Sequence, residues 1–121
     1  MTCTGSSISA DGTLLAIGDF TGEIKVFCSK THKLLQQAHL LVDQIRYLHF
    51  HDSHNNVLLI GTFSGNVYSW SNVGVDLESQ PEKLVTLNKT VTNIRTTQGR
   101  VKLNQLTTVK VHYVIFGTTK G

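Results

Sequence analysis

The histidines near the middle of the chain form its densest group of side chains that could bind a metal ion. His49 and His51 lie two residues apart on a predicted strand, so their side chains share a face, and Asp52 and His54 follow in the next turn. Imidazole and carboxylate groups that converge in this way can bind zinc. However, the two histidines lie on the face opposite to that of the apolar Phe50, and turns favour these polar residues for backbone reasons. We therefore expect these residues to be structural and to bind no metal.

The sequence lacks the signatures of catalysis and of cofactor binding. It contains no Gly-x-Ser-x-Gly elbow, His-Glu-x-x-His helix, phosphate-binding glycine-rich loop or dinucleotide fingerprint. The eight carboxylates are dispersed, although some hydrolases draw a carboxylate pair from loops far apart in sequence. We therefore expect a protein that is not an enzyme and has no cofactor, with a hydrolase of that kind as the weakest alternative.

The composition indicates a folded intracellular chain. Of its 121 residues, 40% are hydrophobic and 16% are charged, which is enough apolar material for a core. No apolar run is long enough to span a bilayer, and the first residues lack the basic and apolar order of a signal peptide. Cys3 and Cys28 do not form the pattern of a secreted disulfide framework. We expect a cytoplasmic location, with the nucleus as a second location.

One stretch of the sequence occurs twice. Residues 17–27 read IGDFTGEIKVF and residues 60–70 read IGTFSGNVYSW. The second copy begins roughly 43 residues after the first, which is the period of the repeat. A short apolar run precedes each copy, and each copy alternates polar and apolar residues after its second glycine. This pattern predicts two strands joined by a tight turn. A period of this length is typical of β-propeller blades.

A third copy starts near the end of the sequence. Residues 116–121 read FGTTKG and match IGTFSG at residues 60–65. The longer spacing to this copy indicates an insertion of roughly 13 residues, which we place in the polar region 96–108, although residues 73–83 are also loop-like. We expect this region to be an exposed loop.

These repeats resemble the WD-repeat family of β-propellers. His39 stands at the histidine of the Gly-His motif that precedes the second blade, and Trp70 stands at the tryptophan of the Trp-Asp motif. Thr21 and Ser64 occupy the position at which the family has an aspartate. The resemblance therefore implies that the polar network of each blade is incomplete in this chain.

The resemblance implies an all-β fold of four-stranded antiparallel sheets. It divides the chain into a first blade at residues 1–38, a second at 39–89 and the start of a third at 90–121. Propellers typically close with 4–8 blades, so we expect an incomplete propeller, which would self-associate if the chain were complete at this length. The positions that we expect to shape the repeat are Gly18, Gly22, Phe27, His39, Gly61, Gly65, Trp70, Gly117 and Gly121. The aromatic side chains that we expect in the core are Phe20, Phe27, Phe50, Phe63 and Trp70.

The resemblance also carries an expectation about function. WD-repeat proteins of this kind act as scaffolds that bind protein partners. The segments TCTG at residues 2–5 and LIGT at residues 59–62 further resemble the opening blades of the angio-associated migratory cell protein and its fungal relatives. That group implies a ribosome-assembly chaperone that shields a basic ribosomal protein of the large subunit. The net charge of +3 argues against the simplest version, because a basic client is best matched by an acidic face.

Binding of RNA is the alternative function. Arg95, Arg100, Lys102 and Lys110 lie close together in the later part of the chain, and the net charge is positive. A basic face can bind phosphates, whereas scattered basic residues are more often part of a solvated surface. We place these four residues in a solvated loop and strand, and keep RNA binding as an open alternative.

Overall fold

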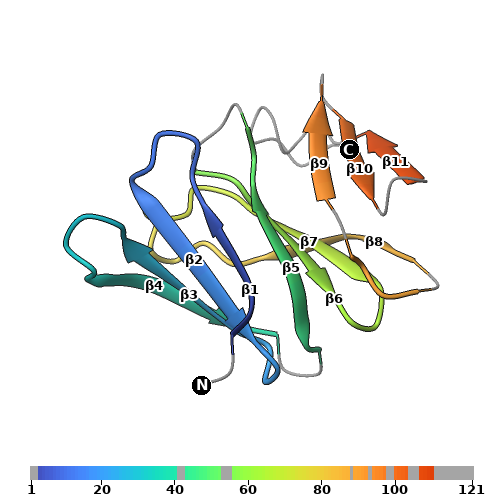
Figure 1. Ribbon diagram of the computed structural model, residues 1–121, viewed down its shortest axis with the longest axis horizontal. Helices are drawn as coiled ribbons and strands as arrows, with labels where there is room; N and C mark the ends of the chain where they lie inside the picture. Colours follow the sequence, from blue (N-terminus) through green and yellow to red (C-terminus); the bar gives the residue numbers. More distant parts are fainter. Residues whose placement is uncertain are drawn as a thin grey trace.

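The computed structural model describes residues 3–40, 43–52, 56–87, 89–92, 94–97, 100–103 and 107–110. Within these ranges the regular secondary structure consists of β-strands, arranged in three sheets (Figure 1). No helix in this part of the chain is long and apolar enough to cross a membrane.

The first sheet contains four consecutive strands. They are β1 (Cys3–Ile8), β2 (Leu14–Asp19), β3 (Glu23–Cys28) and β4 (Leu34–His39), in the spatial order β1-β2-β3-β4. Every neighbouring pair is antiparallel. Strands that are adjacent in sequence are therefore adjacent in space, as tight turns between them require.

The second sheet repeats this arrangement. It consists of β5 (Ile45–Phe50), β6 (Leu58–Thr62), β7 (Asn66–Trp70) and β8 (Glu82–Thr86), again in sequential order and antiparallel. The predicted fold class, all-β with four-stranded antiparallel sheets, is confirmed.

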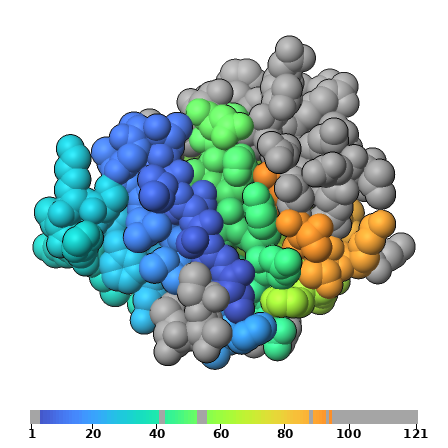
Figure 2. All heavy atoms as spheres, in the orientation of Figure 1, coloured from blue at the N-terminus to red at the C-terminus, as the bar shows by residue number. Residues whose placement is uncertain are grey.

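The two sheets pack against each other through one apolar face each. Strands β1 and β5 lie side by side, as Figures 1 and 2 show. The hydroxyl of Thr4 donates a hydrogen bond to the carbonyl of Ile45, and the Phe50 N–H donates to the Ser7 hydroxyl at 3.0 Å. The buried side chains of the shared core are Leu14, Ala16, Ile24, Val26, Ala38, Ile45, Leu48, Phe50, Leu58, Ile60, Trp70 and Val73. Removing this apolar area from water is the main contribution to the stability of the pair.

Two glycines at equivalent places in the repeat allow each sheet to approach the next element closely. A Cβ atom at Gly18 would lie 2.4 Å from Cγ2 of Ile45 on β5. A Cβ atom at Gly61 would lie 2.3 Å from Cγ1 of Val91, which precedes β9. Both positions therefore exclude a side chain because an apolar residue of the following segment occupies the space.

The third sheet corrects the expectation for residues 96–108. The described part of this segment consists of strands, namely β9 (Ile94–Thr97), β10 (Arg100–Leu103) and β11 (Thr107–Lys110). They form an antiparallel sheet in the order β11-β10-β9. Threonine and valine are frequent in these strands, and β-branched residues favour extended backbone even in a polar segment. The third copy of the repeat, with Gly117 and Gly121, lies outside the described residues.

Candidate functional site

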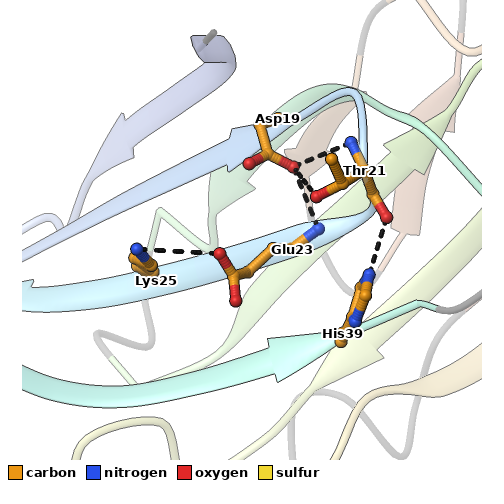
Figure 3. Close-up of polar contacts among 5 residues, drawn as sticks. All are labelled: Asp19, Thr21, Glu23, Lys25 and His39. Atoms are coloured by element: carbon orange, nitrogen blue, oxygen red, sulfur yellow. Dashed lines mark hydrogen bonds and ion pairs between the residues drawn. The ribbon is translucent and has the colours of Figure 1, made fainter. Parts of the chain in front are cut away.

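The turn between β2 and β3 is organised around one carboxylate (Figure 3). Asp19 is 5% exposed, and its Oδ1 accepts hydrogen bonds from the Thr21 N–H at 2.9 Å, the Thr21 hydroxyl at 2.6 Å and the Glu23 N–H at 3.2 Å. His39, at the end of β4, bonds through Nε2 to the Thr21 carbonyl at 2.7 Å. Glu23 in turn lies 3.6 Å from the Lys25 amino group. The turn is therefore fixed to β3 and β4.

The turn between β6 and β7 is fixed in a related way. Thr62 stands at the position of Asp19 in the repeat, and its hydroxyl accepts a hydrogen bond from the Asn66 N–H at 3.0 Å. The carboxylate of Asp43, which is 6% exposed, comes from the link between β4 and β5. It accepts hydrogen bonds from the Ser64 hydroxyl at 2.5 Å and from the Asn66 amide at 2.7 Å. Each turn thus has a largely buried carboxylate at its centre.

These carboxylates lie at positions other than the one at which the family has an aspartate. Thr21 and Ser64 stand at the family's aspartate position, and the resemblance gave no role to Asp19 or Asp43. In the structure both hydroxyls donate to the neighbouring carboxylate. Asp19 had a recognisable signal, because an aspartate at the start of a turn often caps the N–H two residues later.

The environment of both carboxylates favours their charged form. Burial raises the pKa of Asp19, but the hydrogen bonds from Thr21 and Glu23 outweigh burial and hold this pKa below its usual range. Burial likewise raises the pKa of Asp43, and hydrogen bonds from Ser64, Asn66, Thr62 and the Gln44 N–H together lower it further than burial raises it. Both turns are therefore most stable with their aspartates ionised.

Replacing Asp43 with asparagine tests this electrostatic stabilisation. Because its pKa is lower in the folded than in the unfolded state, the contribution of Asp43 is complete above the unfolded value of about 3.9 and is lost as the pH falls through the folded value. Loss of hydrogen bonds to a charged group should cost about 1.5–3 kcal/mol at neutral pH. Urea unfolding of wild type and Asp43→Asn at pH 7 and at pH 3 should show a difference that shrinks in acid. An equal difference at both pH values would contradict the assignment.

Phe20 and Phe63 form an exposed aromatic pair at these turns. They occupy equivalent positions in the repeat and are 48% and 36% exposed, so the expectation that they belong to the core is wrong. Each follows the last residue of a strand, where the alternation that buries Phe50 no longer applies. Their ring centroids are 5.9 Å apart, and Cζ of Arg46 lies 5.9 Å from the centroid of Phe63. We call Phe20, Phe63 and Arg46 the aromatic patch.

The aromatic patch has the chemistry of a contact surface. The β2–β3 and β6–β7 turns that carry the two rings lie at the same end of the molecule (Figure 1). Aromatic and arginine side chains are enriched at protein interfaces, where they contribute much of the binding energy. Phenylalanine rings and a guanidinium group supply no nucleophile and no general base. The patch is therefore suited to binding rather than to catalysis.

Comparison with solved structures identifies the fold. The WD40 repeats of RRP9 superpose with a TM-score of 0.68 and 19% identity, covering 87% of this chain and 35% of that one. Sqt1 of Saccharomyces cerevisiae gives a TM-score of 0.66 and 21% identity, covering 84% of this chain and 28% of that one. The chain folds as WD-repeat propeller blades. It spans about a third of the length of these proteins.

The same fold is found in a designed protein, whereas comparison at the sequence level finds no match. The computationally designed Ika8 protein superposes with a TM-score of 0.66 and 21% identity, covering 84% of this chain and 30% of that one. No family model matches the sequence, and no curated protein sequence matches it. At these identities the structural neighbours establish the WD-repeat fold alone, so that function must be argued from the surface of the blades.

The other expected repeat positions take structural places in the WD-repeat blades. Trp70 is fully buried, and its indole N–H lies 2.9 Å from the Ser79 hydroxyl and 3.1 Å from the Ser79 carbonyl. Gly22 and Gly65 adopt φ of +88° and +98° in the two turns beside the aromatic patch. Phe27 is half-buried near the end of β3.

The described members of the histidine group lie at the end of β5 and just after it. His49 Nε2 lies 3.5 Å from Oδ1 of the exposed Asp52. His51 is 6% exposed, and its backbone N–H donates to the Val57 carbonyl at 2.9 Å. His54 lies outside the described residues. Over the described ranges, no group of three or more histidine, cysteine or acidic side chains is placed to hold a metal ion.

Proposed function

We propose that these WD-repeat blades are a non-catalytic scaffold that binds a protein partner through the aromatic patch. The exposure of Phe20 and Phe63 carries this proposal. Their rings lie in contact at the surface, across two neighbouring blades, while the large side chains between the sheets are buried. A paired aromatic surface of this kind supplies apolar contact area at low conformational cost.

The polar networks beneath the patch support this function. Asp19 and Asp43 hold the turns that carry the rings, so that the patch is ordered before a partner arrives. A surface that is already ordered loses less conformational entropy on binding. Blades of this fold can therefore present a binding surface without any catalytic residue.

A basic ribosomal protein is the partner that we propose for this scaffold. The support is the resemblance of residues 2–5 and 59–62 to the angio-associated migratory cell protein group, whose members act as ribosome-assembly chaperones. Exposed aromatic rings can contact both the apolar and the cationic side chains of such a partner. In this view the blades shield part of the client until it is assembled.

Partner capture with a patch variant tests the proposal. The tagged chain and Phe20→Ser/Phe63→Ser are used to capture proteins from extracts of the source cells, with Ile8→Ser as a control for an exposed apolar residue elsewhere. We expect the patch variant to lose at least about tenfold of the captured partner, as for an interface hot spot. Capture of one large-subunit ribosomal protein supports the chaperone function, whereas several unrelated proteins support a general scaffold. Equal capture by wild type and patch variant contradicts the patch as binding surface.

RNA binding is the second candidate function, and the strand register of the third sheet favours it. Arg95 pairs with Lys102, and Arg100 pairs with Lys110. Paired residues, and residues two apart on a strand, share a face, so that these four positions lie on one face of the sheet. A sheet face that carries four basic positions would suit phosphate groups, which supports this alternative. In the same capture experiment, nuclease treatment and added salt should release partners held through RNA and leave partners of the aromatic patch bound.

A further inference from the structure

The loop between β7 and β8, residues 71–81, displays two large apolar side chains. Val75 is 67% exposed and Leu77 is 63% exposed, the highest values among the large hydrophobic residues whose exposure is described. Each side chain would gain about 1.5–3 kcal/mol from full burial. A partner that covers both would therefore bind favourably at this loop, which we call the β7–β8 loop.

The exposure of these side chains is not the result of a loose loop. Gln36, which is 7% exposed on β4 of the neighbouring blade, donates to the Asp76 carbonyl at 3.0 Å and accepts from the Gly74 N–H at 2.9 Å. The Trp70 indole N–H bonds to Ser79 at the other end of the loop. Val73 is fully buried in the core. Figure 1 shows the loop reaching β4. Val75 and Leu77 are therefore exposed on a loop that is anchored at several points.

Acidic residues flank the two apolar side chains in the sequence, up to the exposed Lys83. Asp76, Glu78 and Glu82 are all exposed, and residues 71–82 contain no lysine or arginine. The chain as a whole has a net charge of +3, so that this loop is a local exception. Three carboxylates beside two apolar groups attract cations and repel phosphate groups and acidic peptides.

We propose that the β7–β8 loop docks a basic segment of a protein partner in which apolar residues alternate with lysine or arginine. Val75, Asp76, Leu77 and Glu78 are consecutive and all exposed on the turns of this loop. Apolar side chains of such a segment can therefore meet apolar ones while its cations meet carboxylates. This proposal rests on the proposed protein-binding function and adds a second surface, at the end of the strands opposite the aromatic patch. A nucleic acid is excluded as the occupant by its charge.

Short labelled peptides test this docking site on the full 121-residue chain. Fluorescence anisotropy is measured with the peptide KVKLK, with its charge-reversed counterpart EVELE and with KSKSK, which lacks apolar residues. We expect KVKLK to bind, with an affinity that falls as salt screens the charges, and the other two peptides to bind at least about tenfold more weakly. Binding of KVKLK no tighter than EVELE overturns the proposal.

Two loop variants separate the apolar from the electrostatic contribution. Val75→Ser/Leu77→Ser should weaken KVKLK binding at least about tenfold. This loss of affinity corresponds to the burial of roughly one apolar side chain. Asp76→Asn/Glu78→Gln/Glu82→Gln should weaken it and flatten its salt dependence. The asparagine keeps an oxygen that can accept the Glu78 N–H, as Asp76 does at 3.0 Å, so that the loop should stay folded.

Matched controls make the outcome specific. Ile8→Ser removes an apolar side chain that is 61% exposed and has no acidic cluster near it in the sequence, and it should bind KVKLK like wild type. If Phe20→Ser/Phe63→Ser abolishes binding while the loop variants do not, the peptide binds the aromatic patch and the loop proposal is wrong. If cellular partners are captured independently of the patch while KVKLK still requires the loop, the patch function fails and the loop proposal stands.

Discussion

Replacing Gly22 with alanine is expected to destabilise the chain by more than about 3 kcal/mol, whereas the same change at Gly12 should cost only about 1–2 kcal/mol. Both glycines have positive φ, +88° and +77°, and the left-handed conformation penalises alanine at either position. They differ in the space available to the new methyl group. A Cβ atom at Gly22 would lie 2.2 Å from the Leu40 carbonyl oxygen and 2.3 Å from that of Asp43, whereas nothing lies within 4 Å of one at Gly12.

This comparison separates backbone strain from steric exclusion. Urea unfolding can be followed by the fluorescence of Trp70, the single tryptophan of the chain. Relief of the clash in Gly22→Ala requires the link that carries Asp43 to move, so we also expect weaker partner binding at the neighbouring aromatic patch. Equal destabilisation by the two substitutions would show that the turn and the link are less closely packed than the structure indicates.

Replacing Trp70 with alanine is expected to cost about 3–5 kcal/mol, the range for a large aromatic residue removed from a core. Its side chain is fully buried between the blades, and it also anchors Ser79 of the β7–β8 loop. Trp70→Phe keeps most of the packing and removes only the indole donor, which should cost about 1–2 kcal/mol. Unfolding of these variants is followed by circular dichroism, because the fluorescent residue is removed.

A double-mutant cycle extends this prediction to the loop. The Gln36 amide also lies 3.3 Å from the Ser79 hydroxyl, so Trp70 and Gln36 share one partner. The effects of Trp70→Phe and Gln36→Ala on the free energy of unfolding should therefore not be additive. Additive effects, or a Trp70→Ala variant as stable as Trp70→Phe, would contradict the account of how the loop is anchored.

The repeat in the sequence was sufficient to predict the blades. The match between residues 17–27 and 60–70 predicted strand, turn and strand twice, and the structure contains both hairpins. The resemblance to the WD repeat also placed Phe50 in the core, where it is buried in the structure, and alternation of side chains extends that placement along the strand. Periodicity predicts these strands because each blade buries one face of its sheet, which requires the same alternation of polar and apolar residues in every blade.

The candidate site was less predictable because it lies where periodicity ends. Phe20 and Phe63 come one residue after a strand, so alternation could not determine whether they point to the core or to solvent. Asp43 comes from a link between blades and reaches the turn only after the chain has folded. The polarity of residues 96–108 hides their strands, because β-branched threonine and valine favour extended backbone when a neighbouring strand can pair with them.

The most direct test of the scaffold account is amide hydrogen exchange of the chain, alone and bound to the partner that it captures. We predict that binding slows exchange at the β2–β3 and β6–β7 turns, around Phe20 and Phe63. Exchange in the paired strands of the two blades should stay the same, since they serve only as support. Protection spread evenly over both sheets, with none at these turns, would mean that binding orders the blades themselves and would contradict a preformed scaffold with an aromatic contact surface.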